Sequence, residues 1–173
     1  GPAAAFTPSG IVTSAGLPFP GDVPNISIKA SSISVSEGGV VLTQRQGPGQ
    51  PGNISIQADT VEVRSGASIA ATNEFEGPGG TLTVNARNVT LDSEGDQLTG
   101  LSAQARFHGD YGFDFSPSLQ LADSGSITVN ATSTLTMRGS AQISTDNLAF
   151  GKSGNVTVNA GDMLLVGAGA NTG

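Results

Sequence analysis

The chain has 173 residues, 25 of them glycine, with no cysteine or tryptophan and a formal net charge of −7. Its few basic residues are scattered, so the sequence predicts no positive patch for nucleic acid or an anionic membrane. No apolar run reaches the roughly 18 residues that a membrane-spanning helix needs, and the lack of cysteine excludes a disulfide framework. Abundant glycine and β-forming residues instead favour many short strands joined by turns.

The first residues are not expected to belong to the fold. Gly1-Pro2 is typical of a protease scar, so we expect residues 1–8 to be an expression scar or linker. The alternation in 10–14 indicates the tail of one repeat, and a proline-rich connection over 18–24 leads into the first full repeat. We therefore expect one domain over 9–173.

A short motif, typified by Asn53-Ile54-Ser55-Ile56-Gln57-Ala58, occurs five times, with copies starting near residues 25, 53, 81, 126 and 155. Such a repeat is the sequence signature of a stacked architecture. Its alternation of apolar and polar residues predicts a strand with one buried face. Two more alternating stretches follow in the same repeat, 61–63 and 69–71, before a glycine-rich turn at 76–80.

Three short strands per repeat, separated by bends, predict an all-β, three-sided parallel β-helix of about five to six rungs. Aligning the repeats gives ladders of inward residues that stack at about 4.8 Å per rung. On the first side these ladders are Ile26, Ile54, Leu82, Ile127 and Val156, then Ile28, Ile56, Val84, Val129 and Val158, then Ala30, Ala58, Ala86, Ala131 and Ala160. On the second side they are Ile33, Val61, Val89, Leu135 and Met163, then Val35, Val63, Leu91, Met137 and Leu165, and on the third side Ile11, Val41, Ile69, Leu101 and Ile143. The small alanine is expected to let the chain turn a corner.

The pattern G-N-I-x-I-x-A…V-x-V-x-x-G-A-x-I-x-A…G-x-G-G, together with G-L-S-A-Q at 100–104, resembles the repeat region of filamentous-haemagglutinin-like exoproteins, cyanobacterial-type members in particular. The resemblance covers residues 10–173. It implies a right-handed β-helix, export by two-partner secretion through an outer-membrane β-barrel transporter, and a secreted or cell-surface location. Because no capping element is evident, we also expect a fragment of a longer solenoid, with end-to-end self-association possible at its open edges.

The long step between residues 81 and 126 holds the largest departure from the repeat. Four extra residues are expected in 93–100, and an inserted loop is expected over about 104–124. The candidate contact residues on this loop are Arg106, Phe107, His108, Asp110, Tyr111, Phe113, Asp114 and Phe115. Loops on a regular scaffold often carry function, and exposed aromatic rings beside Asp suit contacts with a host or neighbouring-cell glycan or protein. The alternative is that the rings fold back and cover one flank of the rod.

No catalytic residue is expected, although polysaccharide-degrading enzymes also use β-helices. Acid–base catalysis needs carboxylates or a basic residue clustered on adjacent rungs. The outward positions of the first side are neutral apart from Lys29: Ser27, Ser55, Thr83, Thr128 and Thr157, flanked by Lys29, Gln57, Asn85, Asn130 and Asn159. We expect these side chains to hydrogen-bond from rung to rung, in preference to the ice-binding array that a uniform threonine face would suggest.

No cofactor is expected, and one weak metal candidate is present. Asp92, Glu94 and Asp96 offer the oxygen ligands that calcium prefers. A solvated turn is the favoured explanation, because the stretch lacks the G-G-x-G-x-D pattern of calcium-binding repeats. Glycosylation sequons at Asn25, Asn53, Asn88, Asn130 and Asn155 mostly follow from the repeat itself, and we expect them to be unmodified.

These features predict an adhesive β-helix segment of a large secreted or surface-exposed exoprotein. It would contact a cell surface or matrix, with no nucleic-acid partner. A carbohydrate-binding or polysaccharide-degrading β-helix and a passive spacer without a ligand are the alternatives.

Overall fold

The computed structural model describes residues 9–16, 21–94, 98–106 and 121–167. Within these ranges the secondary structure consists of strands, and every pairing between named strands is parallel. The strands are β1 (Gly10–Gly16), β2 (Ile26–Lys29), β3 (Ser32–Val35), β4 (Val40–Gln46), β5 (Ile54–Arg64), β6 (Ser68–Asn73), β7 (Leu82–Asp92), β8 (Gly100–Ala105), β9 (Ile127–Gly139), β10 (Gln142–Ser144) and β11 (Val156–Gly167). Across the described part of the chain, no helix has the length and hydrophobicity to span a membrane.

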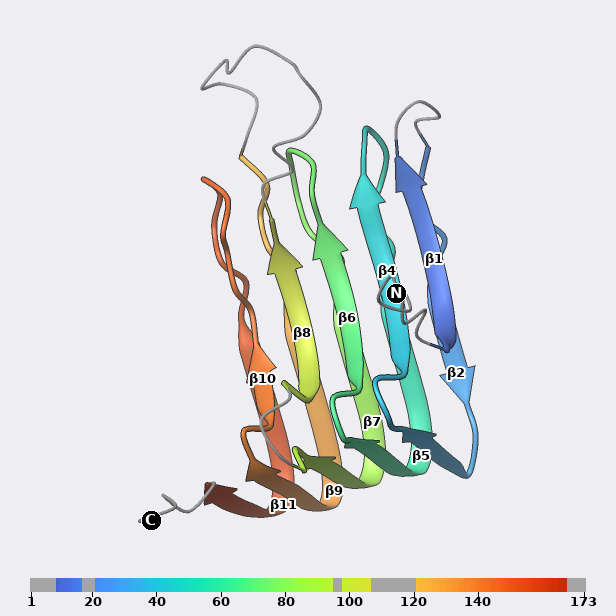
Figure 1. Ribbon diagram of the computed structural model, residues 1–173, viewed down its shortest axis with the longest axis vertical. Helices are drawn as coiled ribbons and strands as arrows, with labels where there is room; N and C mark the ends of the chain where they lie inside the picture. Colours follow the sequence, from blue (N-terminus) through green and yellow to red (C-terminus); the bar gives the residue numbers. More distant parts are fainter. Residues whose placement is uncertain (1–8, 17–20, 95–97, 107–120, 168–173) are drawn as a thin grey trace, which may run out of the picture.

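The strands form two sheets that the chain visits in turn (Figure 1). Sheet A has the order β1-β4-β6-β8-β10, and sheet B has the order β11-β9-β7-β5-β2, with β3 also paired to β5. Because each rung adds one strand to sheet A and then passes to sheet B, the molecule is a β-solenoid of about five turns. The predicted parallel β-helix is confirmed.

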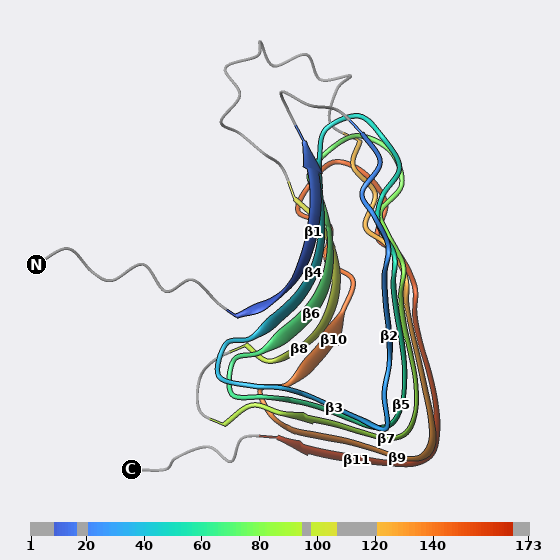
Figure 2. The same cartoon turned by 90° about the vertical axis from the view of Figure 1, so that its right-hand side faces the viewer.

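Viewed along its axis, the solenoid is three-sided although it has only two sheets (Figure 2). The strands of sheet B bend through one corner and so provide two of the sides. We expected a separate strand on each side. Instead, β5 runs unbroken from Ile54 to Arg64, because its pairing with β7 resumes at Thr60↔Asn88 directly after the corner pair Ala58↔Ala86. The predicted corner at alanine is correct. The predicted break between the first two strands occurs in the first rung, between β2 and β3, whereas β5, β7, β9 and β11 continue through the corner.

The predicted ladders of inward residues match the strand register. Ile54, for example, pairs with Leu82, and Leu82 pairs with Ile127. All three side chains are at most 1 % exposed. Full burial of such a side chain contributes about 1.5–3 kcal/mol, so the stacked rungs stabilise one another through a continuous apolar core. The same ladders are exposed on the outermost rung, where Met163 is 52 % and Leu165 is 62 % exposed.

One turn brings successive backbones into close contact. Residues just before the first side are glycine in four rungs: Gly52, Gly80, Gly125 and Gly154. A Cβ added at Gly125 would clash with the carbonyl oxygen of Gly80, and one added at Gly154 would clash with the carbonyl oxygen of Gly125. Glycine is therefore required here by the spacing between rungs.

Candidate functional site

The described residues at each end of the predicted insertion are attached to neighbouring rungs. Gln104 and Ala105 belong to β8 and pair with β6, so they are part of the scaffold. At the other end, Gly77 donates its N–H to the Leu121 carbonyl, and Asp123 donates its N–H to the Gly77 carbonyl. The described residues at both ends of the predicted insertion, about 104–124, therefore belong to the scaffold, and 107–120 lie outside the described residues. Of the candidate contact residues, Phe107, His108, Asp110, Tyr111, Phe113, Asp114 and Phe115 lie outside the described residues.

Arg106 is the one candidate contact residue that the structure describes, and it is attached to the scaffold. Its backbone N–H donates to the Asn73 carbonyl at 2.9 Å. Its Nε and Nη2 atoms donate to Oε1 of Gln104 at 3.0 and 2.7 Å. The side chain is exposed, so it presents a positive charge in a defined place at the end of β8.

Two of the three candidate calcium ligands, Asp92 and Glu94, are described. Asp92 ends β7, and Glu94 accepts a hydrogen bond from the Ser65 hydroxyl at 3.1 Å. Asp96 lies outside the described residues. Among the residues with described positions, no group of three potential metal ligands occurs.

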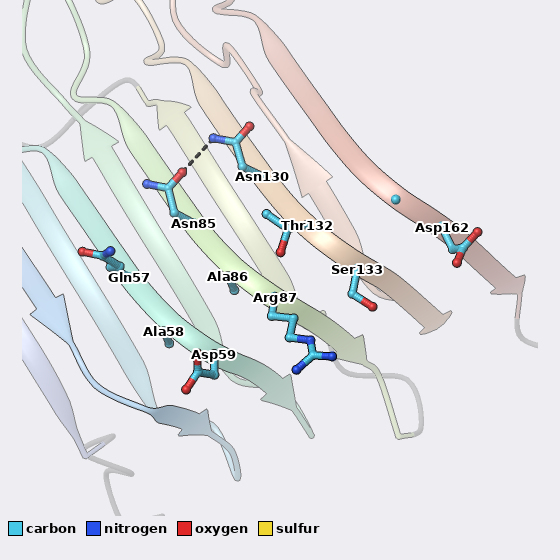
Figure 3. Close-up of a pocket in the computed structure, with 11 residues that line it drawn as sticks. Gln57, Ala58, Asp59, Asn85, Ala86, Arg87, Asn130, Thr132, Ser133 and Asp162 are labelled. Carbon is cyan, nitrogen blue, oxygen red and sulfur yellow. Dashed lines mark hydrogen bonds between the residues drawn. The ribbon is translucent and has the colours of Figure 1, made fainter.

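A polar trough of about 810 Å³ follows the corner of sheet B across the rungs (Figure 3). Its lining comes from β5, β7, β9 and β11 and includes Gln57, Asp59, Arg87, Asn130 and Asp162. The Asn130 Nδ2 donates to Asn85 Oδ1 at 2.7 Å, and Asn159 Nδ2 donates to Asn130 Oδ1 at 2.8 Å. The predicted rung-to-rung bonding is thus confirmed for these amides, which satisfy one another.

A second polar ladder at the start of the first side explains two of the sequons. The Asn25 Oδ1 accepts the backbone N–H of Asn53 at 2.8 Å, and the Asn53 Oδ1 accepts the backbone N–H of Thr81 at 2.8 Å. The Ser126 hydroxyl accepts the backbone N–H of Asn155 in the same manner. Asparagine therefore recurs at this position because it caps the strand of the next rung.

The outer face of sheet A differs from these ladders. This sheet curves so that its concave side faces away from the core (Figure 2). The concavity contains a cavity of about 390 Å³, which we call the sheet A groove. It is lined by Leu42, Gln44, Ser68, Ala70, Thr72, Glu74, Leu98, Thr99, Gly100, Leu101, Ser102, Gln104, Arg106, Gln142, Ser144 and Asp146. Arg106, singled out by the sequence, lies at its rim, whereas the rest of the groove was missed.

Long polar side chains at one end of the groove hold one another in place. The Glu74 carboxylate accepts hydrogen bonds from Nε2 of Gln44 at 3.0 Å and from Nε2 of Gln46 at 2.9 Å. The Asp146 carboxylate accepts one from the Ser144 hydroxyl at 2.9 Å. The two glutamine bonds join β4 to the turn after β6, so the groove has ordered polar groups on a rigid scaffold.

A buried arginine supports this end of the groove from inside. Arg45 is 6 % exposed and donates to the carbonyls of Gly47, Glu76 and Pro78, while its guanidinium lies 5.5 Å from the centre of the Phe75 ring. Desolvation lowers the pKa of Arg45, and the negative charge of Glu76 partly offsets that effect. Arg45 thereby ties the turn of its own rung to the turn of the next.

Asparagine takes over this role on other rungs. Asn73 pairs with Arg45 in register and donates through Nδ2 to the carbonyls of Gly77 and Asp123. Asn147 likewise donates through Nδ2 to the carbonyls of Ala122 and Lys152. On the rung between Asn73 and Asn147, the residue that pairs with both is Ala105, which comes immediately before the predicted contact segment.

Comparisons with known proteins provide no further evidence on the fold or on the groove. No family model, curated protein or solved structure matches this chain.

Proposed function

We propose that this chain is a rigid rod segment of a large secreted or surface-exposed bacterial exoprotein, which contacts cell surfaces or matrix through the outer face of sheet A. The observation that carries the proposal is the sheet A groove, a concave polar surface in an otherwise repetitive scaffold. The predicted contact residues 107–115 follow Arg106 directly in the chain, and Arg106 lines the rim of the groove.

Two further features support contact in place of catalysis. Both oxygens of the Glu74 carboxylate accept hydrogen bonds from the amides of Gln44 and Gln46, so this carboxylate is held in place as part of the groove wall. The outward residues of sheet B engage neighbouring rungs, as in the Asn85–Asn130–Asn159 ladder. We therefore propose a protein without enzymatic activity.

The resemblance to filamentous-haemagglutinin-like repeats supports export through an outer-membrane β-barrel transporter. The net charge of −7 argues against a nucleic-acid partner.

The test is a binding assay of the purified chain against bacterial and host cells, matrix proteins and a glycan array. A variant lacking residues 107–120 and the variant Arg106→Ala are compared with the intact chain. We expect the intact chain to bind at least one of these surfaces, and both variants to bind it less well. Absence of binding to every surface would refute an adhesive role and favour the passive spacer.

A further inference from the structure

The floor of the sheet A groove runs across the strands, along the solenoid axis. Its central row contains Leu42, Ala70, Ser102 and Ser144, which pair in that order from β4 to β10. Three of these four side chains are small, and the preceding row adds Ser68 and Gly100. A path of small residues across three rungs leaves room for an elongated ligand that lies perpendicular to the strands.

The side chains beside this path are planar polar groups with fixed orientation. Gln44 and Gln46 both donate through Nε2 to Glu74, which leaves their Oε1 atoms oriented as acceptors. The Arg106 guanidinium donates to Gln104 through Nε and Nη2, and its Nη1 carries two further N–H groups. Amide and guanidinium groups held in this way suit pairs of neighbouring hydroxyls, because each plane offers hydrogen bonds in two directions.

The charges of the groove select against an anionic ligand. Its described charged residues are two carboxylates, Glu74 and Asp146, and one cation, Arg106. The chain as a whole carries a net charge of −7, which repels polyanions at long range. The large apolar residues of its lining are Leu42, half-buried, Leu98, 71 % exposed at one end, and Leu101, whose side chain is buried in the core. Leu42 and Leu98 offer contact to the C–H face of a sugar ring but little to an apolar peptide.

The spacing of the rungs provides a further match. Neighbouring strands repeat about every 4.8 Å, and an extended chain of pyranose rings has a repeat of the same order. A sugar chain along the floor would therefore meet an equivalent position on each of β4, β6 and β8. The cavity of about 390 Å³ falls within the usual range of ligand sites, about 300–1,000 Å³.

We propose that the sheet A groove binds an uncharged, extended glycan chain that lies across β4, β6, β8 and β10. The proposal rests on the proposed contact function and adds the ligand class and the residues that recognise it. Gln44, Gln104 and Arg106 hydrogen-bond to ring hydroxyls, and Ser102 keeps the floor low enough for the rings to enter.

The test uses the whole chain and hexasaccharides of the cello-, xylo- and malto- series as neutral probes, with oligogalacturonate as the acidic probe. Affinities are measured by isothermal titration calorimetry for the intact chain and for two variants. Ser102→Phe fills the floor of the groove, and Thr128→Phe places the same ring on the outer face of sheet B, where Thr128 is also a half-buried outward strand residue. Circular dichroism and thermal unfolding establish that each variant is folded.

We expect at least one neutral probe to bind, Ser102→Phe to weaken it at least tenfold, and Thr128→Phe to leave it within twofold. If Ser102→Phe does not fold, Gln104→Leu replaces it, and a threefold or greater loss is expected. Tighter binding of oligogalacturonate than of every neutral probe would overturn the proposal. So would equal loss in the two phenylalanine variants.

The two proposals fail in different ways. If the chain binds cells or matrix protein but no neutral probe, the glycan proposal is wrong and the contact function stands. If it binds none of the cells, matrix proteins or glycans, the contact function fails as well.

Discussion

The outer faces of the two sheets are built from the same repeat but have different consequences. On sheet B one outward row carries the same residue on three successive rungs, so that Asn85, Asn130 and Asn159 bond to one another. On sheet A the outward residues vary along a row, as in Leu42, Ala70, Ser102 and Ser144. Identical amide side chains on neighbouring rungs satisfy one another's hydrogen bonds. Unlike side chains on neighbouring rungs leave hydrogen-bonding groups available to a ligand.

This difference predicts that substitutions on the sheet B side change the stability of the protein and leave ligand binding intact. Substitutions on the outer face of sheet A should weaken ligand binding and leave stability unchanged.

The largest effect is expected at the turn that begins sheet B. Gly125→Ala places a Cβ against the Gly80 carbonyl, which forces two rungs apart and costs about 3 kcal/mol of unfolding free energy. Urea unfolding of the intact chain and the variant measures this change. Gly21→Ala is the control, because no atom lies within 4 Å of the added Cβ and the change should stay within about 0.5 kcal/mol. Equal stability of the two variants would contradict the close approach of the rungs.

The next effect concerns the buried support beneath the groove. Arg45→Met removes hydrogen bonds to the carbonyls of Gly47, Glu76 and Pro78 and leaves polar groups unpaired, so we expect a loss of about 2 kcal/mol. Thermal unfolding measures this loss. Arg87→Met is the control, since Arg87 is exposed at the corner of sheet B. A loss no larger than that of Arg87→Met would show that Arg45 does not hold the turns together.

A smaller effect is expected within the amide ladder itself. Asn130→Ala removes the hydrogen bonds to both Asn85 and Asn159, one part-buried and one exposed. At the low end of the range for such bonds, about 0.5 kcal/mol each, the loss should be about 1 kcal/mol. Thr128→Ala, on the same strand and face, is expected to cost less. Stability comes from urea unfolding, and binding is measured in parallel. A loss of glycan binding in Asn130→Ala, with stability unchanged, would reverse the roles assigned to the two faces.

The smallest effect is a gain. Gln57 pairs with Asn85 in register at the end of the amide ladder, so Gln57→Asn extends the row by one matching side chain. We expect an increase of about 0.5 kcal/mol in unfolding free energy, from one added rung-to-rung bond. A higher melting temperature than that of Gln57→Ala would agree with this expectation, and equal melting temperatures would contradict it.

The sequence alone was sufficient for the periodic part of the structure. Inward and outward positions alternate along each strand, and the repeat aligns them from rung to rung. This is why the ladder from Ile26 to Val156 and the alanine corner are correct. The asparagine ladder on the outer face follows from the same local rule.

The tertiary structure decided what the repeat does not encode. The bent but unbroken β5, the placement of Arg106 on the scaffold and the Arg45 clamp all depend on partners in another rung, about thirty residues away. The sheet A groove is the clearest case. Its side chains follow no shared pattern, and its concavity comes from the curvature of a whole sheet, so only the stacked rungs bring Gln44, Ser102 and Arg106 to one surface.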